Sequence, residues 1–400
     1  MQKVIVIAYL LYICLFSYMP KSFQTIGFVV FIFLSVFLIW KNRRGIWLRL
    51  SLDVETKRLK KLFITFLIVS AFYLAISFLN LPQFWNIDKL MYNMKYIPRH
   101  FFIIAELFIP LGLGYVIYKK KMLQKIKSFY LIILFMLIFF TNPSLSIKGI
   151  LLISLALIAW KNDMKDLLLF AFFIFYYQAA YVLGYIAMML FISFEKEIVS
   201  FLRKDTNHKI IFAFSSAILL TYTLWGVIMG FVLEDENSLW RLNVWINEFN
   251  SLSQTYLTGV GFGSAYVTEN ILYQTDNYNM FFNNEEGLME VGAFIVANHS
   301  SFINMFYRMG LIGGGLFLAL NFQLICVTIK MYYRATKKMR QLLWYMLSVW
   351  IYETVVIALN PGLEMMQFAM SYLLSLAVLF AVILEIQGSH HNEHIRYLTN

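Results

Sequence analysis

Charged residues are scarce in this chain of 400 residues: only 14% are Asp, Glu, Lys or Arg, whereas 60% are hydrophobic. Soluble proteins contain about 25% charged and about 45–50% apolar residues. The shortage of charge therefore excludes a chain of soluble domains and predicts an integral membrane protein. The net charge of +11 does not indicate a nucleic-acid-binding protein, because the basic residues occur in short blocks between apolar runs rather than on one amphipathic face.

Cysteine and internal repetition are also nearly lacking. The two cysteines, Cys14 and Cys326, each lie within an apolar run, so they cannot form a disulfide framework or a metal cluster. No internal repeat or low-complexity linker is visible in the sequence. This counts modestly against secondary transporters, many of which are built from repeated halves.

The chain does contain a series of long apolar runs. A membrane-spanning helix needs about 20 mostly apolar residues, and its backbone polar groups must be satisfied within the segment. The sequence predicts an all-α polytopic membrane protein with about twelve transmembrane helices. The expected spans are 4–19, 22–40, 62–80, 101–118, 128–141, 146–160, 166–179, 181–194, 210–232, 300–329, 341–359 and 363–386.

The segment 166–194 is long for one helix and short for two, and the distribution of charge decides between them. With two crossings there, all the basic clusters fall on one side of the membrane, as the positive-inside rule requires. Those clusters lie within 41–61, 119–127, 161–165, 195–209 and 330–340. The inner side then has 26 basic and 9 acidic residues, or +17, and the outer side has 7 basic and 13 acidic residues, or −6.

We therefore expect both termini to be cytoplasmic and divide the chain into four parts. They are 1–232, with nine transmembrane helices and an outer loop at 81–100; a large periplasmic loop at 233–299; 300–386, with three further transmembrane helices; and a cytoplasmic tail at 387–400.

The large loop 233–299 contains nine acidic residues but a single basic one, Arg241. Two interpretations are open. Arg241 pairs with neighbouring carboxylates and fixes the loop, or its planar guanidinium clamps phosphate oxygens in bidentate fashion. Because Arg241 and Trp245 are four residues apart, they share one face of a helix. Trp240 and Trp245 suit a helix lying at the membrane interface.

The rest of this loop offers turn glycines and one histidine. Gly259, Gly261 and Gly263 alternate along the chain, which favours a tight turn or a close backbone approach. The loop ends with Asn298 and His299, just before an expected span. A lone histidine more often has a structural role, but an unperturbed pKa near 6.5 also makes it a natural general base.

Ionisable residues within the expected spans are a further signal. Ends of long side chains near a helix terminus can reach the interface, but ionisable groups in hydrocarbon are costly and are candidates for function by default. The residues of this kind are Glu106, Lys148, Arg308, Glu353 and Glu364, all in the outer part of the bilayer. Their restriction to one leaflet favours a functional site at the outer face.

Four features occur in a fixed order around the large loop. They are Arg241 with Trp245, the glycine turn 258–263, His299 with Ser300, and the Gly-x-x-Gly of 309–313. This set resembles the O-antigen ligase and Wzy-type polysaccharide polymerase superfamily, whose pattern is Arg-x3-Trp, a Gly-x-Gly turn, a His-Asn pair before a membrane helix, and Gly-x-x-Gly. The resemblance covers about 75 residues closely and the whole chain in topology.

The sequence departs from that pattern at three points. Asn298 precedes His299 instead of following it, and Arg308 stands where relatives often have an acidic or small residue. A fainter match, the 146–149 segment before the sixth span, has Lys148 where many relatives have Arg.

The resemblance implies a GT-C-like fold and a metal-independent glycosyltransferase at the periplasmic face of the bacterial inner membrane. Its donor is an undecaprenyl-pyrophosphate-linked oligosaccharide, and the lipid bilayer is its environment. No His or carboxylate cluster with metal spacing occurs in the outer loops, so we expect cations to stabilise the leaving pyrophosphate and expect no cofactor. A chain-length regulator protein is a further candidate partner.

Residue roles follow from this implied chemistry. Arg241 is expected to be the main pyrophosphate clamp and His299 the base for the acceptor hydroxyl. The further candidates for pyrophosphate binding are Lys148, Arg99, Arg308 and Lys95, and the secondary site candidates are Trp245, Asn298, Glu106 and Glu353.

Three functions remain open at this point. A polymerase would extend a lipid-linked glycan, a ligase would transfer it to lipid A core, and a flippase would only translocate it. Low Gly and Pro content together with Phe, Lys and Tyr richness indicates an AT-rich gene, as polysaccharide clusters often are, which favours an O-antigen or capsular polysaccharide polymerase slightly. Against a flippase, the charged residues within spans stay near one face.

Overall fold

The computed structural model describes most of the predicted bundle and isolated parts of the large loop. The described residues are 1–80, 104–141, 148–168, 179–202, 222, 241–242, 244–246, 248, 250, 255, 257–261, 300–360, 363 and 366–399. Every regular element within these residues is a helix.

The helices follow the expected spans closely in several places. Their bounds are α1 (Gln2–Leu15), η1 (Phe16–Tyr18), α2 (Lys21–Arg49), α3 (Val54–Asn80), α7 (Phe108–Lys119), α8 (Met122–Lys125), α9 (Ser128–Thr141), α10 (Lys148–Asn162), α11 (Ala179–Ser193), α12 (Glu195–Leu202), α18 (Ser301–Arg334), α19 (Lys337–Leu359) and α20 (Met366–Thr399). The spans expected at 166–179 and 210–232 fall almost wholly outside the described residues.

Four of these helices are long and apolar enough to cross a membrane, counted within the described residues. They are the segments Phe23–Arg49, Ser301–Arg334, Lys337–Leu359 and Ala369–Ser389. Large apolar side chains also point outward from α1, α2 and α9, among them Leu11, Phe33 and Ile133. An all-helical bundle with apolar groups on its outside suits a lipid environment.

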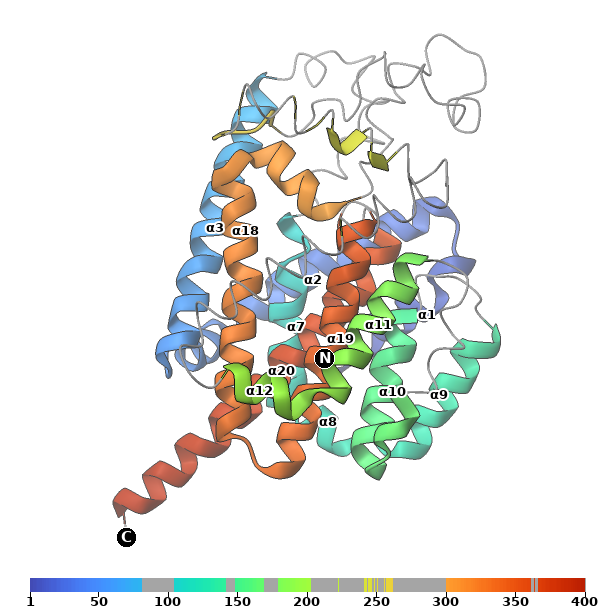
Figure 1. Cartoon of the computed structure of the whole chain (residues 1–400), viewed down its shortest axis with the longest axis vertical. Coiled ribbons are helices and arrows are strands. Elements are labelled where there is room, and N and C mark those ends of the chain that lie inside the picture. The colour runs from blue at the N-terminus through green and yellow to red at the C-terminus, as the bar shows by residue number, and fades with distance from the viewer. Residues whose placement is uncertain are drawn as a thin grey trace.

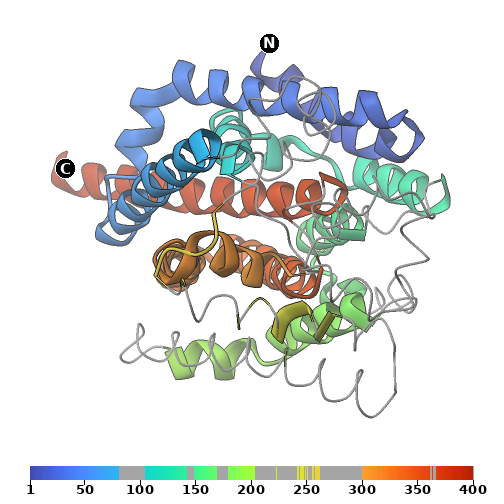
Figure 2. The ribbon, with the colours of Figure 1, turned by 90° about the horizontal axis from the view of Figure 1, so that it is seen from above.

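The helices pack in layers around α19 and α20. Seen from above, α1 and α2 form one side, α20 runs through the middle, α18 and α19 follow, and α11 and α12 lie on the far side (Figure 2). α19 contacts α10, α11, α18 and α20, and α3 lies along α18 (Figure 1). Trp344 and Trp350 of α19 are fully buried, which makes this helix the centre of the core.

α10 and α11 run in the same direction, antiparallel to α19. The indole of Trp160, near the end of α10, donates to the carbonyl of Lys338 at the start of α19 (2.8 Å), and the indole of Trp344 donates to the carbonyl of Phe191 near the end of α11 (2.9 Å). The number of crossings in 166–194 stays a prediction.

Basic residues from several helices meet at one end of the bundle, here called the basic end. The contacts that join them are Arg334 with Asp53, Lys330 with Glu55 (3.5 Å), Lys161 with the carbonyl of Gln124 (3.1 Å) and Lys119 with Asn42 (3.0 Å). Gln2 near the N-terminus also reaches Asn42 (3.4 Å), and Gln387 of α20 reaches Thr56 (3.1 Å). The clusters that the sequence placed on one side thus lie together.

Three element boundaries differ from the expectation. α20 continues to Thr399, beyond the expected end of the last span at 386, because no proline interrupts the helix. α7 begins at Phe108 rather than at 101, with Pro110 in its first turn, where a missing backbone N–H is tolerated. Glu106 therefore precedes this helix instead of lying within it. α18 is broken at Gly310, where a continuous span was expected.

Candidate functional site

Arg241 and Trp245 both face the end of α19. Arg241 is 9% exposed, and its Nη1 donates to the carbonyl of Leu359 (3.4 Å). Trp245 is 4% exposed and packs with Leu359 and Ile303 in one apolar cluster. The two side chains thus share one face, as their spacing predicted. The single cation of the acidic loop is held against the transmembrane bundle rather than out in the loop.

Tyr222 joins this group, although the sequence interpretation did not single it out. Its hydroxyl donates to the carbonyl of Ala358 (2.9 Å) and lies 2.6 Å from Ser300 Oγ. Its ring meets Trp245 edge-on, with centroids 5.2 Å apart. Because the phenol has one proton, the Ser300 hydroxyl donates to the Tyr222 oxygen when that proton goes to Ala358. The only sequence signal was a hydroxyl within an apolar run.

Ser300 fixes the start of α18. Its Oγ accepts a hydrogen bond from the backbone N–H of Ile303 (3.2 Å), so Ser300 is the N-cap of this helix. Ser301 has another role, because its Oγ accepts from the backbone N–H of Leu363 (2.9 Å). Tyr222, Arg241, Trp245 and Ser300 together are called the Arg241 cluster below.

The glycine turn docks on the broken part of α18. The backbone N–H of Val260 donates to the carbonyl of Tyr307 (2.9 Å), and the backbone N–H of Gly261 donates to the carbonyl of Arg308 (3.0 Å). Gly310 has φ 59° and ψ −161°, and Gly259 has φ 67°, conformations that side chains with a Cβ rarely adopt. A Cβ on Gly310 would lie 2.4 Å from the carbonyl oxygen of Leu257. The glycine turn and the Gly-x-x-Gly motif of α18 therefore contact each other directly through their backbones. This contact is called the join below.

Arg308 strengthens this join. It is fully buried, its Nη1 donates to the carbonyl of Gly261 (3.2 Å), and its guanidinium carbon lies 5.1 Å from the ring centre of Tyr307. These contacts give Arg308 a structural role in fastening the turn. Its role in binding an anion stays a prediction.

Lys148 lies in a second buried group, here called the Lys148 cluster and consisting of Lys148, Tyr181, Tyr352, Glu353 and Ser371. Lys148 begins α10, is 6% exposed, and places its Nζ 5.0 Å from the ring centre of Tyr181. The rings of Tyr181 and Tyr352 are 6.4 Å apart. Glu353 is 2% exposed and accepts a hydrogen bond from Ser371 (3.2 Å). The cluster thus combines a cation, a carboxylate and three hydroxyl groups.

The glycine after Lys148 permits this arrangement. A Cβ on Gly149 would lie 1.6 Å from Glu353 Oε1 and 2.6 Å from the Cβ of Ser371. Only a residue without a side chain allows α10 to approach α19 and α20 this closely. The Lys-Gly pair at the start of α10 is therefore explained by packing as well as by any role of the lysine charge.

The two clusters lie at the same end of the bundle, opposite the basic end. Leu359 is six residues beyond Glu353 on α19, a rise of about 9 Å. α11 bridges them, because Tyr181 packs on Tyr352 while Leu183 packs against the apolar group that contains Trp245. Arg241, Lys148 and Arg308 thus belong to the end of the molecule that lacks the basic blocks.

The remaining candidates are placed only in part. Glu106 is 1% exposed and lies close enough to Tyr9 and Tyr372 to interact with them electrostatically, on the side of α20 away from the Arg241 cluster. His299, Asn298, Arg99, Lys95 and Glu364 lie outside the described residues.

No group of three or more His, Cys, Asp or Glu that could hold a metal ion occurs within the part of the chain that the structure describes. No protein-family model and no curated protein matches the sequence.

Proposed function

We propose that this protein is a polysaccharide polymerase that joins undecaprenyl-pyrophosphate-linked repeat units at the periplasmic face of the bacterial inner membrane. The proposal rests on the sequence pattern around Arg241 and on the buried cations at one end of the bundle. It makes the chain a glycosyltransferase of the O-antigen or capsular type. A GT-C-like fold with twelve spans and cytoplasmic termini is part of the same proposal.

The observation that carries the proposal is the placement of Arg241. The described basic blocks gather at the basic end, yet Arg241 is held against Leu359 at the opposite end, with Lys148 and Arg308 on the same end. Cations that are buried away from the charged interface are costly and suit a site for an anionic ligand. A lipid pyrophosphate carries two to three negative charges and matches that need.

The proposed reaction is a displacement at the anomeric carbon. A sugar hydroxyl of the acceptor attacks the anomeric carbon of the donor glycan, a glycosidic C–O bond forms, and the C–O bond to the pyrophosphate breaks. The hydroxyl proton passes to His299, and undecaprenyl pyrophosphate leaves with the electron pair. Arg241 and Lys148 stabilise the charge on that leaving group, which is often the largest catalytic effect in such a site.

Substitution of the proposed groups tests the mechanism. Arg241→Ala should abolish glycan chain extension, because the loss of one charge-stabilising donor costs about 10²–10³-fold in rate. His299→Ala should abolish it as well, because the loss of a general base costs about 10²–10⁴-fold in rate. Both variants should still reach the membrane. Arg241→Lys should also be strongly impaired if bidentate geometry matters. Full activity in Arg241→Ala or His299→Ala would remove that residue from the mechanism.

Deletion of the gene separates the functions that use the same donor. Gel analysis of the surface glycan should show single-repeat products if the protein is a polymerase. Unlinked full-length polymer would instead indicate a ligase that acts on lipid A core, and loss of all periplasmic glycan would indicate a flippase.

A further inference from the structure

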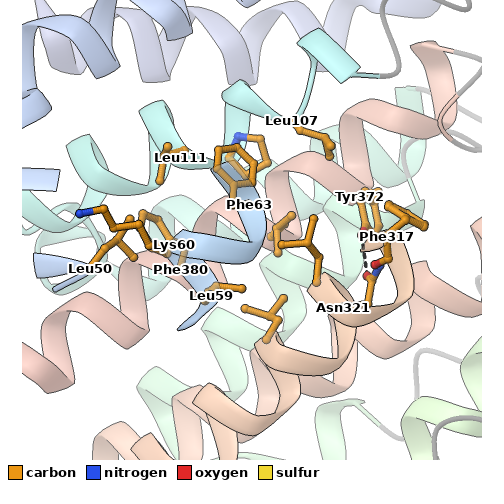
Figure 3. A pocket seen from close by; sticks show the side chains of 14 residues that line it. Leu50, Leu59, Lys60, Phe63, Leu107, Leu111, Phe317, Asn321, Tyr372 and Phe380 are labelled. Carbon is orange, nitrogen blue, oxygen red and sulfur yellow. Dashed lines mark hydrogen bonds between the residues drawn. The ribbon is translucent and has the colours of Figure 1, made fainter. Parts of the chain in front are cut away.

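An apolar cavity lies between α3, α7, α18 and α20. It has a volume of about 120 Å³ and is partly open to the outside. At one end it is bordered by Lys60, Leu50 and Phe380, and at the other by Asn321 and Tyr372 (Figure 3), and Leu376 of α20 also lines it. No role in the proposed reaction involves this cavity.

The walls of the cavity require no polar partner. Nearly all the side chains that line it are apolar. At the deep end the two polar residues satisfy one another: Tyr372 donates to Asn321 Oδ1 (3.3 Å), and the amide nitrogen of Asn321 donates to the carbonyl of Phe317 (2.8 Å). A ligand that enters this space therefore needs a hydrocarbon part.

The other end of the cavity is positively charged. Lys60 lies in the first turns of α3, at the basic end, and its amine points away from the apolar side chains (Figure 3). The Nζ of Lys60 donates to Ser51 Oγ (3.0 Å) and lies 5.2 Å from the ring centre of Trp47. A lysine, a hydroxyl and an indole at the mouth of an apolar cavity match the phosphate region of a lipid.

We propose that the cavity holds one acyl chain of an anionic phospholipid, with the headgroup phosphate at Lys60. Tyr372 and Phe380 are eight residues apart on α20, so the cavity follows the helix for about 12 Å, which is part of one leaflet. Basic pockets between transmembrane helices at the cytoplasmic side bind anionic headgroups. The site does not depend on the proposed polymerase activity, because none of the residues that line it has a role in the proposed reaction.

Native mass spectrometry of the full-length protein in detergent tests this site. The probes are palmitoyl-oleoyl phosphatidylglycerol, which is anionic, and palmitoyl-oleoyl phosphatidylcholine, which is zwitterionic. The wild type should retain one phosphatidylglycerol in preference to phosphatidylcholine. Lys60→Ala should weaken phosphatidylglycerol binding about fivefold, the effect of one lysine near an anionic surface. Lys57→Ala is the matched control, because Lys57 is an exposed lysine on the same helix and does not line the cavity.

A second variant tests the cavity itself. Leu376→Trp should fill the space and reduce binding of both lipids, and its thermal unfolding is compared with that of the wild type to exclude loss of the fold. Equal binding of the two lipids to the wild type would overturn the role of charge. Equal phosphatidylglycerol binding by Lys60→Ala and Lys57→Ala, or unchanged binding by folded Leu376→Trp, would overturn the assigned site.

Discussion

The replacement of Gly310 by alanine tests the join between the glycine turn and α18. Gly310 has φ 59° and ψ −161° inside the helix, a conformation that is nearly restricted to glycine. The new Cβ would lie 2.4–2.6 Å from the carbonyl group of Leu257 and the nitrogen of Gly259. These are backbone atoms, so the contact cannot be relieved by rotation of a side chain. The turn must move away from the helix.

The size of the effect follows from two contributions. Strain at such a position costs about 1–3 kcal/mol. The two backbone hydrogen bonds to Tyr307 and Arg308 are lost when the turn moves, at about 0.5–1.5 kcal/mol each. Gly310→Ala should therefore reduce the free energy of unfolding by roughly 2–6 kcal/mol.

Gly315→Ala is the matched control on the same helix. Nothing lies within 4 Å of a Cβ at Gly315, and its φ is not positive. Alanine there should stabilise the helix by about 0.5–1 kcal/mol. The assay is thermal unfolding in detergent, combined with limited proteolysis of the loop that contains Gly259. Equal stability and equal cleavage in the two variants would refute the proposed join.

Substitutions at Tyr222, Trp245, Gly149 and Glu353 test the two clusters, each by thermal unfolding of the purified variant. Tyr222→Phe removes the hydroxyl that contacts Ser300 and Ala358 and should cost about 1–3 kcal/mol, whereas an unchanged melting temperature would show that these hydrogen bonds contribute nothing. Trp245→Ala should lower the free energy of unfolding by about 3–5 kcal/mol, because it leaves a cavity beside Leu359 and Ile303. Trp245→Phe should lower it clearly less, because the phenyl ring fills part of that cavity. Equal losses in the two variants would argue against this packing. Gly149→Ala should destabilise the protein because its Cβ overlaps Glu353, and Glu353→Ala should restore part of the loss in the double variant. Additive losses in that pair would contradict the close approach.

Much of the helical architecture could be predicted, because apolar runs and blocks of charge are local features of the sequence. α9 has the expected bounds, and α10 and α11 begin two residues from the expected positions. The described residues of the basic blocks 41–61, 119–127, 161–165 and 330–340 lie at one end of the bundle, as the distribution of charge in the sequence led us to expect. The number of spans and their orientation in the membrane stay predictions.

The departures arise where a single residue alters a helix through contacts that are distant in sequence. The break in α18 depends on the contact of Gly310 with Leu257 and Gly259. The hydrophobic periodicity of the expected span 300–329 could not predict that contact. The alternating glycines predicted a tight turn or a close backbone approach, but they did not show which of the two or which segment the turn would contact. Packing of this kind becomes visible only in three dimensions.

The candidate site, too, could be predicted from the sequence only in part. The spacing of Arg241 and Trp245 predicted their shared face. Tyr222 could not be found, because a tyrosine in an apolar run has no distinguishing pattern until its hydroxyl meets Ser300 and Ala358. The charge of Arg308 suggested anion binding, whereas its described contacts fasten the glycine turn.

Synthesis by the purified protein tests the central proposal most directly. The protein, reconstituted in lipid, is incubated with undecaprenyl-pyrophosphate-linked repeat units without added metal, and the products are separated by length. The proposed polymerase should give a ladder of lengths that Arg241→Ala abolishes. Translocation of the lipid-linked units without any new glycosidic bond would contradict the account.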